Sequence, residues 1–341
     1  MLAALYSNAI SQSAKRLLLL TIAISYCGRE CELTAEDPYV SVGLSKIVVN
    51  PRQASQTIKR PISCEIRVPM ASTQPSLRSC ITFLTDFGTR DTYAAQMKGV
   101  ALGINPDIQF VDLTHEIPPQ QILRGAFVWN DSVAAFPAGT IHVGVVDPGD
   151  GSDRRLVAAE IGEYRFVCPD NGLLTVILQN ASLHRAVSLD NRKWWRKSVS
   201  NTFHGRDILT PVAAHWSLGV DLAELGTPLV APLFTLALSN KRRGQTSIIG
   251  QIVDVDRFGN LVTDIEPNQL PPHRTFLRFE IGAFHVNGLS TCYADVDEGE
   301  PLVLIGSSGR LEISIRNGNA AEELQADFGC RVVARWERAG S

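Results

Sequence analysis

The order of apolar segments between residues 80 and 146 constrains the fold of this 341-residue chain more than any other feature. Three buried-strand patterns alternate there with two amphipathic helical patterns, in the order 80–85, 92–102, 108–113, 118–135 and 140–146. Such alternation is typical of a parallel sheet, because each parallel connection needs a crossover that is usually a helix. We therefore expect residues 80–238 to form an α/β domain built on a parallel, Rossmann-like sheet.

The pattern changes after a polar segment at residues 239–245, which we interpret as a linker. Six short strand patterns follow without a long helix, separated by Gly, Asn and Asp, at 247–255, 261–265, 276–281, 302–305, 311–315 and 331–336. Short strands with turn residues between them favour a small barrel or sandwich. The predicted fold class is therefore α/β, with a smaller C-terminal β-barrel at residues 246–338.

The N-terminal region, residues 1–75, shows neither the alternation of strands and helices nor the series of short strands. Lys15 and Arg16 precede an apolar run at residues 17–24 that resembles a signal-peptide core but is too short to cross a bilayer. No sustained hydrophobic periodicity follows this run. We expect residues 1–75 to be a disordered extension or the product of a start assigned too far upstream. We expect a cytoplasmic protein, and export guided by residues 15–27 is the alternative.

Composition narrows the choice of partners. The net charge of −3 gives no basic footprint of the kind that nucleic-acid binding needs. The seven cysteines are scattered and odd in number, so they indicate reduced thiols rather than a disulfide framework or a zinc site. We therefore expect a small-molecule substrate and neither nucleic acid nor membrane as a partner.

Candidate chemistry follows the predicted strands, since ligands of open α/β sheets bind outside the carboxyl ends of the strands. Asp86, His115 and Asp147 all lie at such ends. Asp86 could accept two sugar hydroxyls or simply be a turn residue. Asp147 and Arg154 flank a glycine-rich turn that can fold back, so that the guanidinium meets the carboxylate in a catalytic or a structural pair.

His204 lies in a loop just before an apolar segment that begins a helix, between Phe203 and Gly205. We expect Arg206 and Asp207 to bracket the imidazole with opposite charges. We expect Gly205 to adopt a positive φ or to let a ligand approach the backbone. The polar loops after the strands are expected to converge on His204. The other two histidines of interest, His115 and His142, rank below it. Asp86, His115, Asp147 and Asp207 could bind a metal through oxygen and nitrogen, although their spacing does not require one.

Six motifs, taken together, are more specific than any of these residues alone. They occur in order as TDFGTRDTYAAQMKGV (85–100), VVDPGDGSDRR (145–155), PDNGLL (169–174), TFHGRDILTPVAAH (202–215), DRFGNLVTDI (256–265) and GSSGRLEISIRNGNAA (306–321). Over residues 80–338 the chain resembles the S-adenosyl-L-methionine (SAM) hydroxide adenosyltransferases. These are the SAM hydrolases related to fluorinase and chlorinase.

The resemblance implies that SAM and water become adenosine and L-methionine, without a cofactor or metal. It also implies a homotrimer that binds SAM where the first domain of one subunit meets the second domain of its neighbour. Asp147, Arg154 and His204 match the set that holds the attacking water or hydroxide, and Asp86 matches the acid that binds the ribose hydroxyls. The other substrate-binding positions that it implies, for adenine and for the methionine end, are Phe258, Asn260, Ser307, Ser308, Ile315 and Asn317.

Three positions depart from the family pattern: Asp150 replaces a common Val, Asp264 an Asn and Arg310 a Tyr. Three other functions stay open at this point. A SAM-dependent halogenase of the fluorinase type would have Ser at position 205 and Tyr at positions 147 and 204. A sensor that binds SAM or adenosine would have no use for a positioned water. A metal-dependent hydrolase would hold a metal.

Overall fold

The computed structural model describes residues 39–40, 68–69, 79–238, 242–271 and 277–337. It separates two compact units, Met1–Ser76 and Leu77–Ser341. The first unit contains one described strand pair, in which β1 (Tyr39–Val40) lies antiparallel to β2 (Val68–Pro69). The rest of the predicted N-terminal extension lies outside the described residues, as does the start of the predicted linker, so both predictions stay untested.

The second unit begins with a seven-stranded mixed sheet in the order β4-β3-β5-β7-β6-β8-β9. Strands β4, β3, β5 and β7 are parallel, and β6, β8 and β9 are antiparallel to their neighbours. The bounds are β3 Cys80–Thr85, β4 Gln109–Thr114, β5 Ile141–Val145, β6 Leu156–Ile161, β7 Tyr164–Pro169, β8 Leu183–Ser188 and β9 Thr227–Pro228. The predicted α/β class is confirmed, and the sheet is parallel only in its first half.

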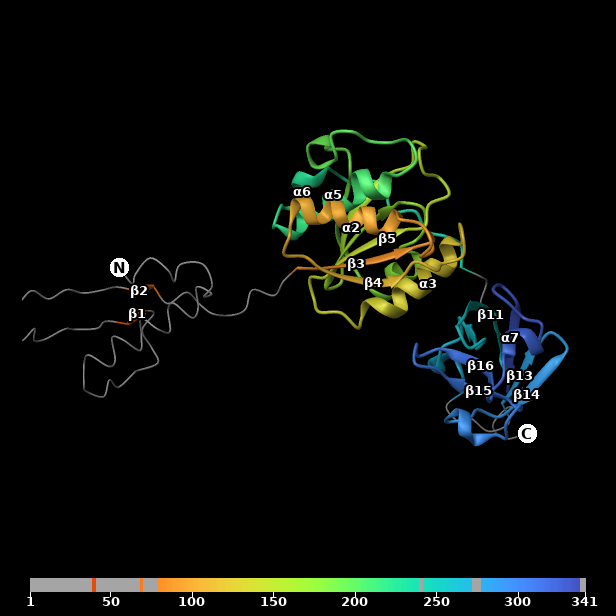
Figure 1. The fold of residues 1–341 in the computed structure, drawn as a ribbon. Coiled ribbons are helices and arrows are strands. Elements are labelled where there is room, and N and C mark those ends of the chain that lie inside the picture. The colour runs from red at the N-terminus through yellow and green to blue at the C-terminus, as the bar shows by residue number, and fades with distance from the viewer. Residues whose placement is uncertain (1–38, 41–67, 70–78, 239–241, 272–276, 338–341) are drawn as a thin grey trace, which may run out of the picture. The chain divides into compact units, whose positions relative to one another are not determined.

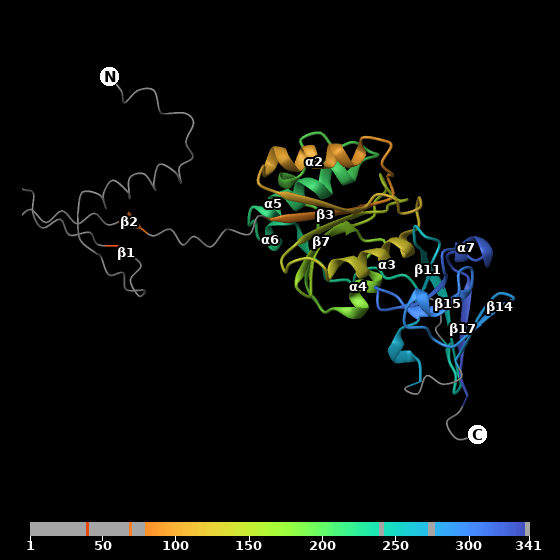
Figure 2. The ribbon, with the colours of Figure 1, turned by 60° about the horizontal axis from the view of Figure 1, so that its bottom comes forward.

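Helices cover both faces of this sheet (Figures 1 and 2). Helices α2 (Tyr93–Ile104) and α5 (Thr210–Ser217) pack on one face, and α3 (Ile122–Val133) and α4 (Thr175–Asn180) on the other. Side chains of a strand alternate between faces: Ile81 and Phe83 of β3 join the core beneath α2 and α5, and Leu84 joins the core beneath α3. Shorter helices complete the domain: η1 (Arg192–Trp194), η2 (Gly205–Leu209) and α6 (Leu222–Leu225).

Some details differ from the sequence-based expectations. The predicted hairpin about Gly162 is confirmed as β6 and β7. Helix α2 has Thr92 and not Asp91 at its N-terminal cap, and no side chain caps it. Strand β8 was not predicted, because its first three residues are exposed and so provide no apolar alternation. Within the described residues, no helix combines the length and the apolar character that a membrane crossing requires.

The C-terminal part forms an antiparallel sheet in the order β14-β13-β17-β11-β12-β16-β15, with β10 paired to β11. Beyond β14, the Ser290 amide donates to the Val303 carbonyl of β15 at 2.7 Å, so the two ends of the sheet nearly close a barrel. The strand bounds are β10 Arg242–Arg243, β11 Ser247–Val255, β12 Leu261–Thr263, β13 Arg278–Ile281, β14 Phe284–Asn287, β15 Pro301–Ile305, β16 Leu311–Ile315 and β17 Arg331–Arg335. The short helices are η3 Pro267–Gln269, η4 Tyr293–Asp295 and α7 Ala320–Glu323.

The predicted barrel is therefore confirmed, with β14 as an additional strand. Position 276 of the predicted strand 276–281 lies outside the described residues. Two ion pairs link α3 to the barrel strands and loops: Arg124 Nε donates to Asp254 at 2.6 Å, and Arg310 Nη2 lies 3.2 Å from Asp131. The guanidinium of Arg310 also lies 4.9 Å from the centroid of the Phe127 ring.

Candidate active site

The end of strand β5 positions the first candidate residue. The Val146 carbonyl accepts a hydrogen bond from Asn171 Nδ2 at 2.8 Å, which fixes the chain just before Asp147. The amide of Asp150 then donates to the Asp147 carbonyl at 3.2 Å and closes a tight turn. Only 3% of the Asp147 side chain is exposed, so its charge needs a partner.

The glycine-rich turn after Asp147 lies against the loop that leads to His204. Gly151 has a φ of +85°, and a Cβ there would collide with the Asn201 carbonyl oxygen. A side chain at this position would therefore be strained and would push the two loops apart. The turn and the His204 loop can approach each other because position 151 is glycine.

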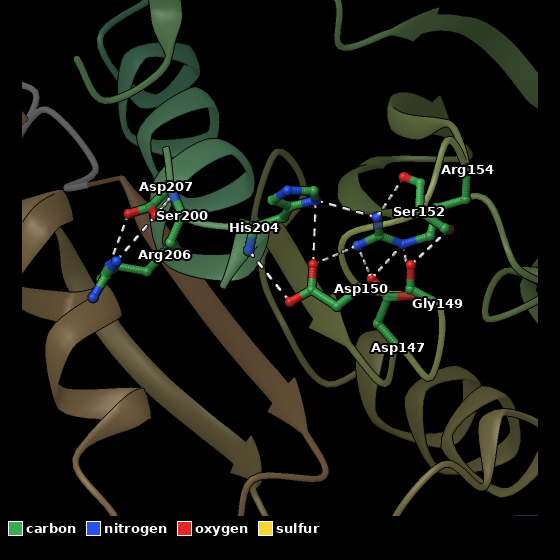
Figure 3. A network of polar contacts seen from close by, with 9 residues as sticks. All are labelled: Asp147, Gly149, Asp150, Ser152, Arg154, Ser200, His204, Arg206 and Asp207. Carbon is green, nitrogen blue, oxygen red and sulfur yellow. Dashed lines mark hydrogen bonds and ion pairs between the residues drawn. The ribbon is translucent and has the colours of Figure 1, made fainter. Parts of the chain in front are cut away.

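Arg154 is the partner that Asp147 needs, and it is the centre of the polar network in Figure 3. Its Nε donates to both Asp147 oxygens, at 2.8 and 2.7 Å, and its Nη2 also bonds Asp147. Nη2 donates to Asp150 Oδ1 at 2.9 Å, and Nη1 lies 3.1 Å from His204 Nδ1. The expected fold-back of Arg154 onto Asp147 is confirmed, and the same guanidinium reaches His204.

Asp150 contacts both Arg154 and His204. Besides its bond to Arg154, its Oδ1 lies 3.2 Å from His204 Nδ1, and its Oδ2 accepts the His204 amide hydrogen at 3.4 Å. Its side chain is 24% exposed, compared with 16% for His204 and 11% for Arg154. The sequence indicates an additional anion near the site at position 150, but not this contact with the imidazole.

His204 directly precedes the π-helical turn η2, which continues into α5. Such turns are rare and occur often at functional sites. Gly205 does not have a positive φ, and a Cβ there would be in ordinary contact with Val145 and Phe203 at 3.4 Å. The expectation of a positive φ at Gly205 is therefore wrong, and the positive φ occurs at Gly151 instead. The alternative, that Gly205 lets a ligand approach the backbone, stays a prediction.

The neighbouring charges form a separate cluster. Asp207 is fully buried and accepts hydrogen bonds from Arg206 Nε at 2.7 Å, Arg196 Nη1 at 2.7 Å and the Ser200 amide at 2.8 Å. Burial alone would raise the pKa of Asp207, but the bonds from Arg206, Ser200 and Arg196 lower it well below its ordinary value. In Figure 3 this cluster lies apart from the imidazole of His204, so Arg206 and Asp207 anchor the loop rather than bracket the ring.

Asp86 lies at the end of the neighbouring strand β3. Its Oδ2 accepts the Gln120 amide hydrogen at 2.9 Å. Burial raises the pKa of Asp86, the bond from Gln120 partly offsets this rise, and the negative charge of Asp147 adds to it. The charge of Asp147 therefore acts on Asp86 at the same edge of the sheet.

The other polar candidates have structural contacts. His115 Nδ1 lies 2.8 Å from Thr85 Oγ1, and its Nε2 lies 3.1 Å from Asp112. His142 is buried, bonds Thr82 at 2.7 Å, and has its pKa lowered to about 3 by burial. Within the described part of the chain, no group of three or more His, Cys, Asp or Glu side chains is arranged to hold a metal ion.

The loops converge on His204 only in part. Phe87, Tyr93 and Phe203 pack their rings together with centroids 5.3 to 5.7 Å apart, which brings the loop after β3 to the His204 loop. In the part of the chain that the structure describes, the loop after β7 does not contact His204 through Asp170. Asp170 pairs instead with Arg155, the residue after Arg154, and accepts the Phe234 amide hydrogen at 2.7 Å.

The remaining predicted substrate-binding residues lie on the barrel. Phe258 is 75% exposed, whereas Asn260 is buried and its Nδ2 donates to Asp256 at 2.9 Å. Ile315 ends β16, and Asn317 follows with a φ of +56°. Ser307 and Ser308 lie in the turn between β15 and β16. Among the described residues, no hydrogen bond or ion pair links these six positions to Asp147, Arg154 or His204.

Family models decide the relationship. The SAM hydroxide adenosyltransferase N-terminal domain matches residues 81–226, and the corresponding C-terminal domain matches residues 250–333. This chain belongs to the SAM hydroxide adenosyltransferase family. Asp147, Arg154 and His204 fall within the first match, and all six barrel positions fall within the second.

Named relatives agree with the family. The chain is 38% identical over 256 residues to an (R)-S-adenosyl-L-methionine hydrolase of Salinispora tropica, covering 74% of this chain and 96% of the relative. A Thermus thermophilus protein of the same name is 35% identical, with 74% and 98% coverage. A fluorinase of Actinoplanes is 28% identical, with 69% and 90% coverage.

Solved structures share the fold. A conserved Thermotoga maritima protein matches with a TM-score of 0.71 at 32% identity, covering 74% of this chain and 99% of that one. A conserved hypothetical protein of Thermus thermophilus matches with a TM-score of 0.61, also at 32% identity, with 76% and 100% coverage.

Two of the three departures from the family pattern lie away from the Asp147 network. Arg310 is buried and pairs with Asp131 of α3. Asp264 is buried on the barrel, where its Oδ1 accepts the Gln251 amide hydrogen at 2.9 Å. Only Asp150 contacts the candidate catalytic residues.

The Asp207 cluster generates a prediction about stability. Asp207→Asn should lower the free energy of unfolding at pH 7 by roughly 1.5–3 kcal/mol, the usual contribution of a hydrogen bond to a charged group. The folded-state pKa is depressed, so the stabilisation is complete above the unfolded pKa of about 3.9 and is lost as the pH falls toward the folded value. Urea unfolding at pH 7 and pH 3 should show a smaller penalty at pH 3.

Asp153→Asn is the matched control, because Asp153 is exposed and has no hydrogen bond or ion pair within the described structure. It should leave stability unchanged. An Asp207→Asn penalty of the same size at both pH values would contradict this account.

Proposed function

We propose that this protein hydrolyses SAM to adenosine and L-methionine. The observation that carries the proposal is the joining of Asp147, Arg154 and His204 in one network in a member of this family. Relatives at 32–38% identity are named (R)-S-adenosyl-L-methionine hydrolase, which supports the same activity here.

The chemistry fits these residues. The sulfonium of SAM makes methionine a neutral leaving group, so no acid has to protonate it. An oxygen lone pair of water attacks C5′, and the electrons of the C5′–S bond return to sulfur. Arg154 stabilises the negative charge that builds on the attacking oxygen. Asp147 orients the guanidinium, and the water proton passes to a base in the network.

A halogenase is the alternative that the fluorinase relatives raise. Three matching fluorinases are 25–28% identical to this chain, which is below the 32–38% identity of the relatives named as hydrolases. Asp147 and Asp150 place two carboxylates around Arg154, and their negative charge disfavours a halide there. The network therefore favours water as the nucleophile over chloride or fluoride. A sensor that binds SAM without turnover would not need this network.

The names of the relatives specify the (R) sulfonium of SAM. We extend the proposal to this diastereomer. The reaction needs no cofactor and no metal in this proposal, and the protein acts in the cytoplasm.

The ribose and the ends of SAM need further contacts. Asp86 binds the ribose hydroxyls, and the barrel provides the sites for adenine and methionine. Because Phe258 is largely exposed and no polar contact joins the barrel positions to Arg154 within the described residues, a neighbouring subunit would complete the site. We propose a homotrimer on this basis and on the family resemblance.

Product analysis tests the proposed function. Incubation with (R)-SAM, and separately with (S)-SAM, should yield adenosine and methionine in equal amounts from the (R) form. Added chloride or fluoride should leave the products unchanged. A 5′-halo-adenosine as the main product, or no turnover of either diastereomer by folded protein, would overturn the proposal.

Two substitutions should separate catalysis from binding. Asp147→Asn removes the charge that holds Arg154, so turnover should fall while SAM still binds. Asp86→Ala leaves the ribose hydroxyls unpaired, and the loss of roughly 1.5–3 kcal/mol corresponds to about ten- to hundredfold weaker binding. Calorimetry and turnover assays on both variants check this. Lost binding in Asp147→Asn with normal binding in Asp86→Ala would reverse the two assignments.

Subunit mixing tests the shared site. Asp147→Asn and Asn260→Ala each disable a different half of the proposed site. Unfolded and refolded together, they should regain part of the activity, since some mixed sites combine two intact halves. Activity no higher than that of the separate variants would contradict a site shared between subunits.

A further inference from the structure

The turn from Asp147 to Arg154, here called the catalytic turn, connects two strands that do not pair with each other. It leaves β5 and enters β6, and β7 lies between these strands in the sheet. Because β7 is parallel to β5 and antiparallel to β6, its carboxyl end lies beside the end of β5 and the start of β6. The loop that follows β7, residues 170–172, therefore emerges between the two ends of the catalytic turn.

Asn171 of this loop holds the first end of the turn. Its Nδ2 donates to the Val146 carbonyl at 2.8 Å, one residue before Asp147. Its Oδ1 accepts the Leu173 amide hydrogen at 3.3 Å, so both polar atoms of the side chain are engaged. Val146 is fully buried, and a buried carbonyl that loses its partner destabilises the conformation that buries it. Asn171 therefore fixes the backbone where the catalytic turn begins.

Asp170 holds the second end. Its amide donates to the Arg155 carbonyl at 2.9 Å, and its Oδ2 accepts a hydrogen bond from Arg155 Nη2. Its Oδ1 accepts the Phe234 amide hydrogen at 2.7 Å. Only 3% of the Asp170 side chain is exposed, so its charge depends on the guanidinium of Arg155. These bonds fix the backbone directly after Arg154.

The interior of the catalytic turn contributes little rigidity of its own. It contains Gly149 and Gly151, and Gly151 is exposed. Its backbone hydrogen bonds are local: the Asp150 amide donates to the Asp147 carbonyl at 3.2 Å, and the Ser152 amide donates to the Gly149 carbonyl at 3.0 Å. The position of the turn on the sheet therefore depends on how its two ends are held.

We infer that Asp170 and Asn171 are positioning residues for the reaction, because they hold the two ends of the catalytic turn and so keep Arg154 in place against Asp147. Both act through the backbone and not through contact with SAM. The kinetic consequence rests on the proposed function, whereas the holding of the turn is a property of the free protein. Arg154 can stabilise charge on the attacking oxygen only if it is already oriented. A misplacement of about 1 Å can cost about 100-fold in rate.

The first test measures the catalytic turn in the free protein, without SAM. Asn171→Leu keeps the size of the side chain and removes its donor. Asp170→Asn keeps an acceptor for the Phe234 amide and removes the charge that pairs with Arg155. In both variants the amides of residues 147–155 should exchange with deuterium about fivefold faster or more, because a lost hydrogen bond lowers the free energy of opening. Mass spectrometry of the peptides that cover these residues measures the rates.

Asn105→Leu is the matched control. Asn105 is buried, its Nδ2 donates to Ser217 Oγ at 2.9 Å, and its Oδ1 accepts the Asp107 amide hydrogen at 3.0 Å. It therefore loses the same two kinds of bond as Asn171→Leu, but it lies before the amino end of β4, away from the catalytic turn. Its exchange rates in the turn should equal those of the wild type. Wild-type rates in both loop variants, or the same acceleration in the control, would overturn the inference.

The second test is kinetic and shows whether the position of the turn matters for the reaction. Asn171→Leu and Asp170→Asn should lower kcat by about ten- to hundredfold. The KM for SAM should change less than kcat, as expected when an interaction acts in the transition state. Rates are expressed per folded protein, with the folded fraction taken from circular dichroism, so that a general loss of stability does not lower them. Asn105→Leu should keep the wild-type kcat. Unchanged kcat in both loop variants would show that they do not position Arg154 for catalysis.

A double-mutant cycle tests the ion pair as the tie at the second end. Arg155→Gln should also lower kcat, and the double variant with Asp170→Asn should lose much less than the product of the two single losses, since both changes remove the same pair. Fully multiplicative losses would contradict this assignment. An inactive wild type would refute the proposed hydrolysis, whereas the exchange experiment decides separately whether Asp170 and Asn171 hold the turn.

Discussion

The ion pair between Arg154 and Asp147 is the interaction on which the rest of the site depends. A buried carboxylate at the end of β5 needs a cation, and Arg154 meets this need from seven residues further along the chain. In doing so it closes the turn and presents its Nη1 to His204. A buried charge without its partner costs several kcal/mol, so Asp147 and Arg154 hold each other in one geometry. Positioned groups of this kind lower a barrier because they are already oriented when charge develops on the attacking oxygen.

A second, separate charge cluster keeps His204 in place. Asp207 belongs to the π-helical turn η2, and its buried carboxylate accepts hydrogen bonds from two arginines and a backbone amide. The loop therefore has its own anchor, and His204 is free to direct its ring toward Arg154. This division matters for function, because the anchoring charges do not compete for the imidazole. The close approach of the two loops depends on the glycine at position 151, where a side chain would meet the Asn201 carbonyl.

Much of this could be predicted from the sequence, and the failures have physical causes. Strands β3, β11 and β16 were predicted with their observed bounds, because they are apolar runs bordered by turn residues. The Asp147–Arg154 pair followed from two charges across a glycine-rich turn. Strand β8 was missed because its first residues are exposed, so the sequence shows no apolar alternation there. Its pairing with β6 depends on contacts between segments that are distant in the sequence. The roles of Arg206 and Asp207 were misjudged, since sequence adjacency to His204 says nothing about the direction of a side chain. The contact of Asp150 with the imidazole needs three-dimensional proximity across 54 residues.

The central claim is that this network delivers water to C5′ of SAM. It is tested most directly by one turnover in water enriched in oxygen-18, followed by mass spectrometry of both products. The account predicts one labelled oxygen in adenosine, at the 5′-hydroxyl, and none in methionine. Adenosine without the label, or a product cleaved at another carbon of the sulfonium, would contradict it.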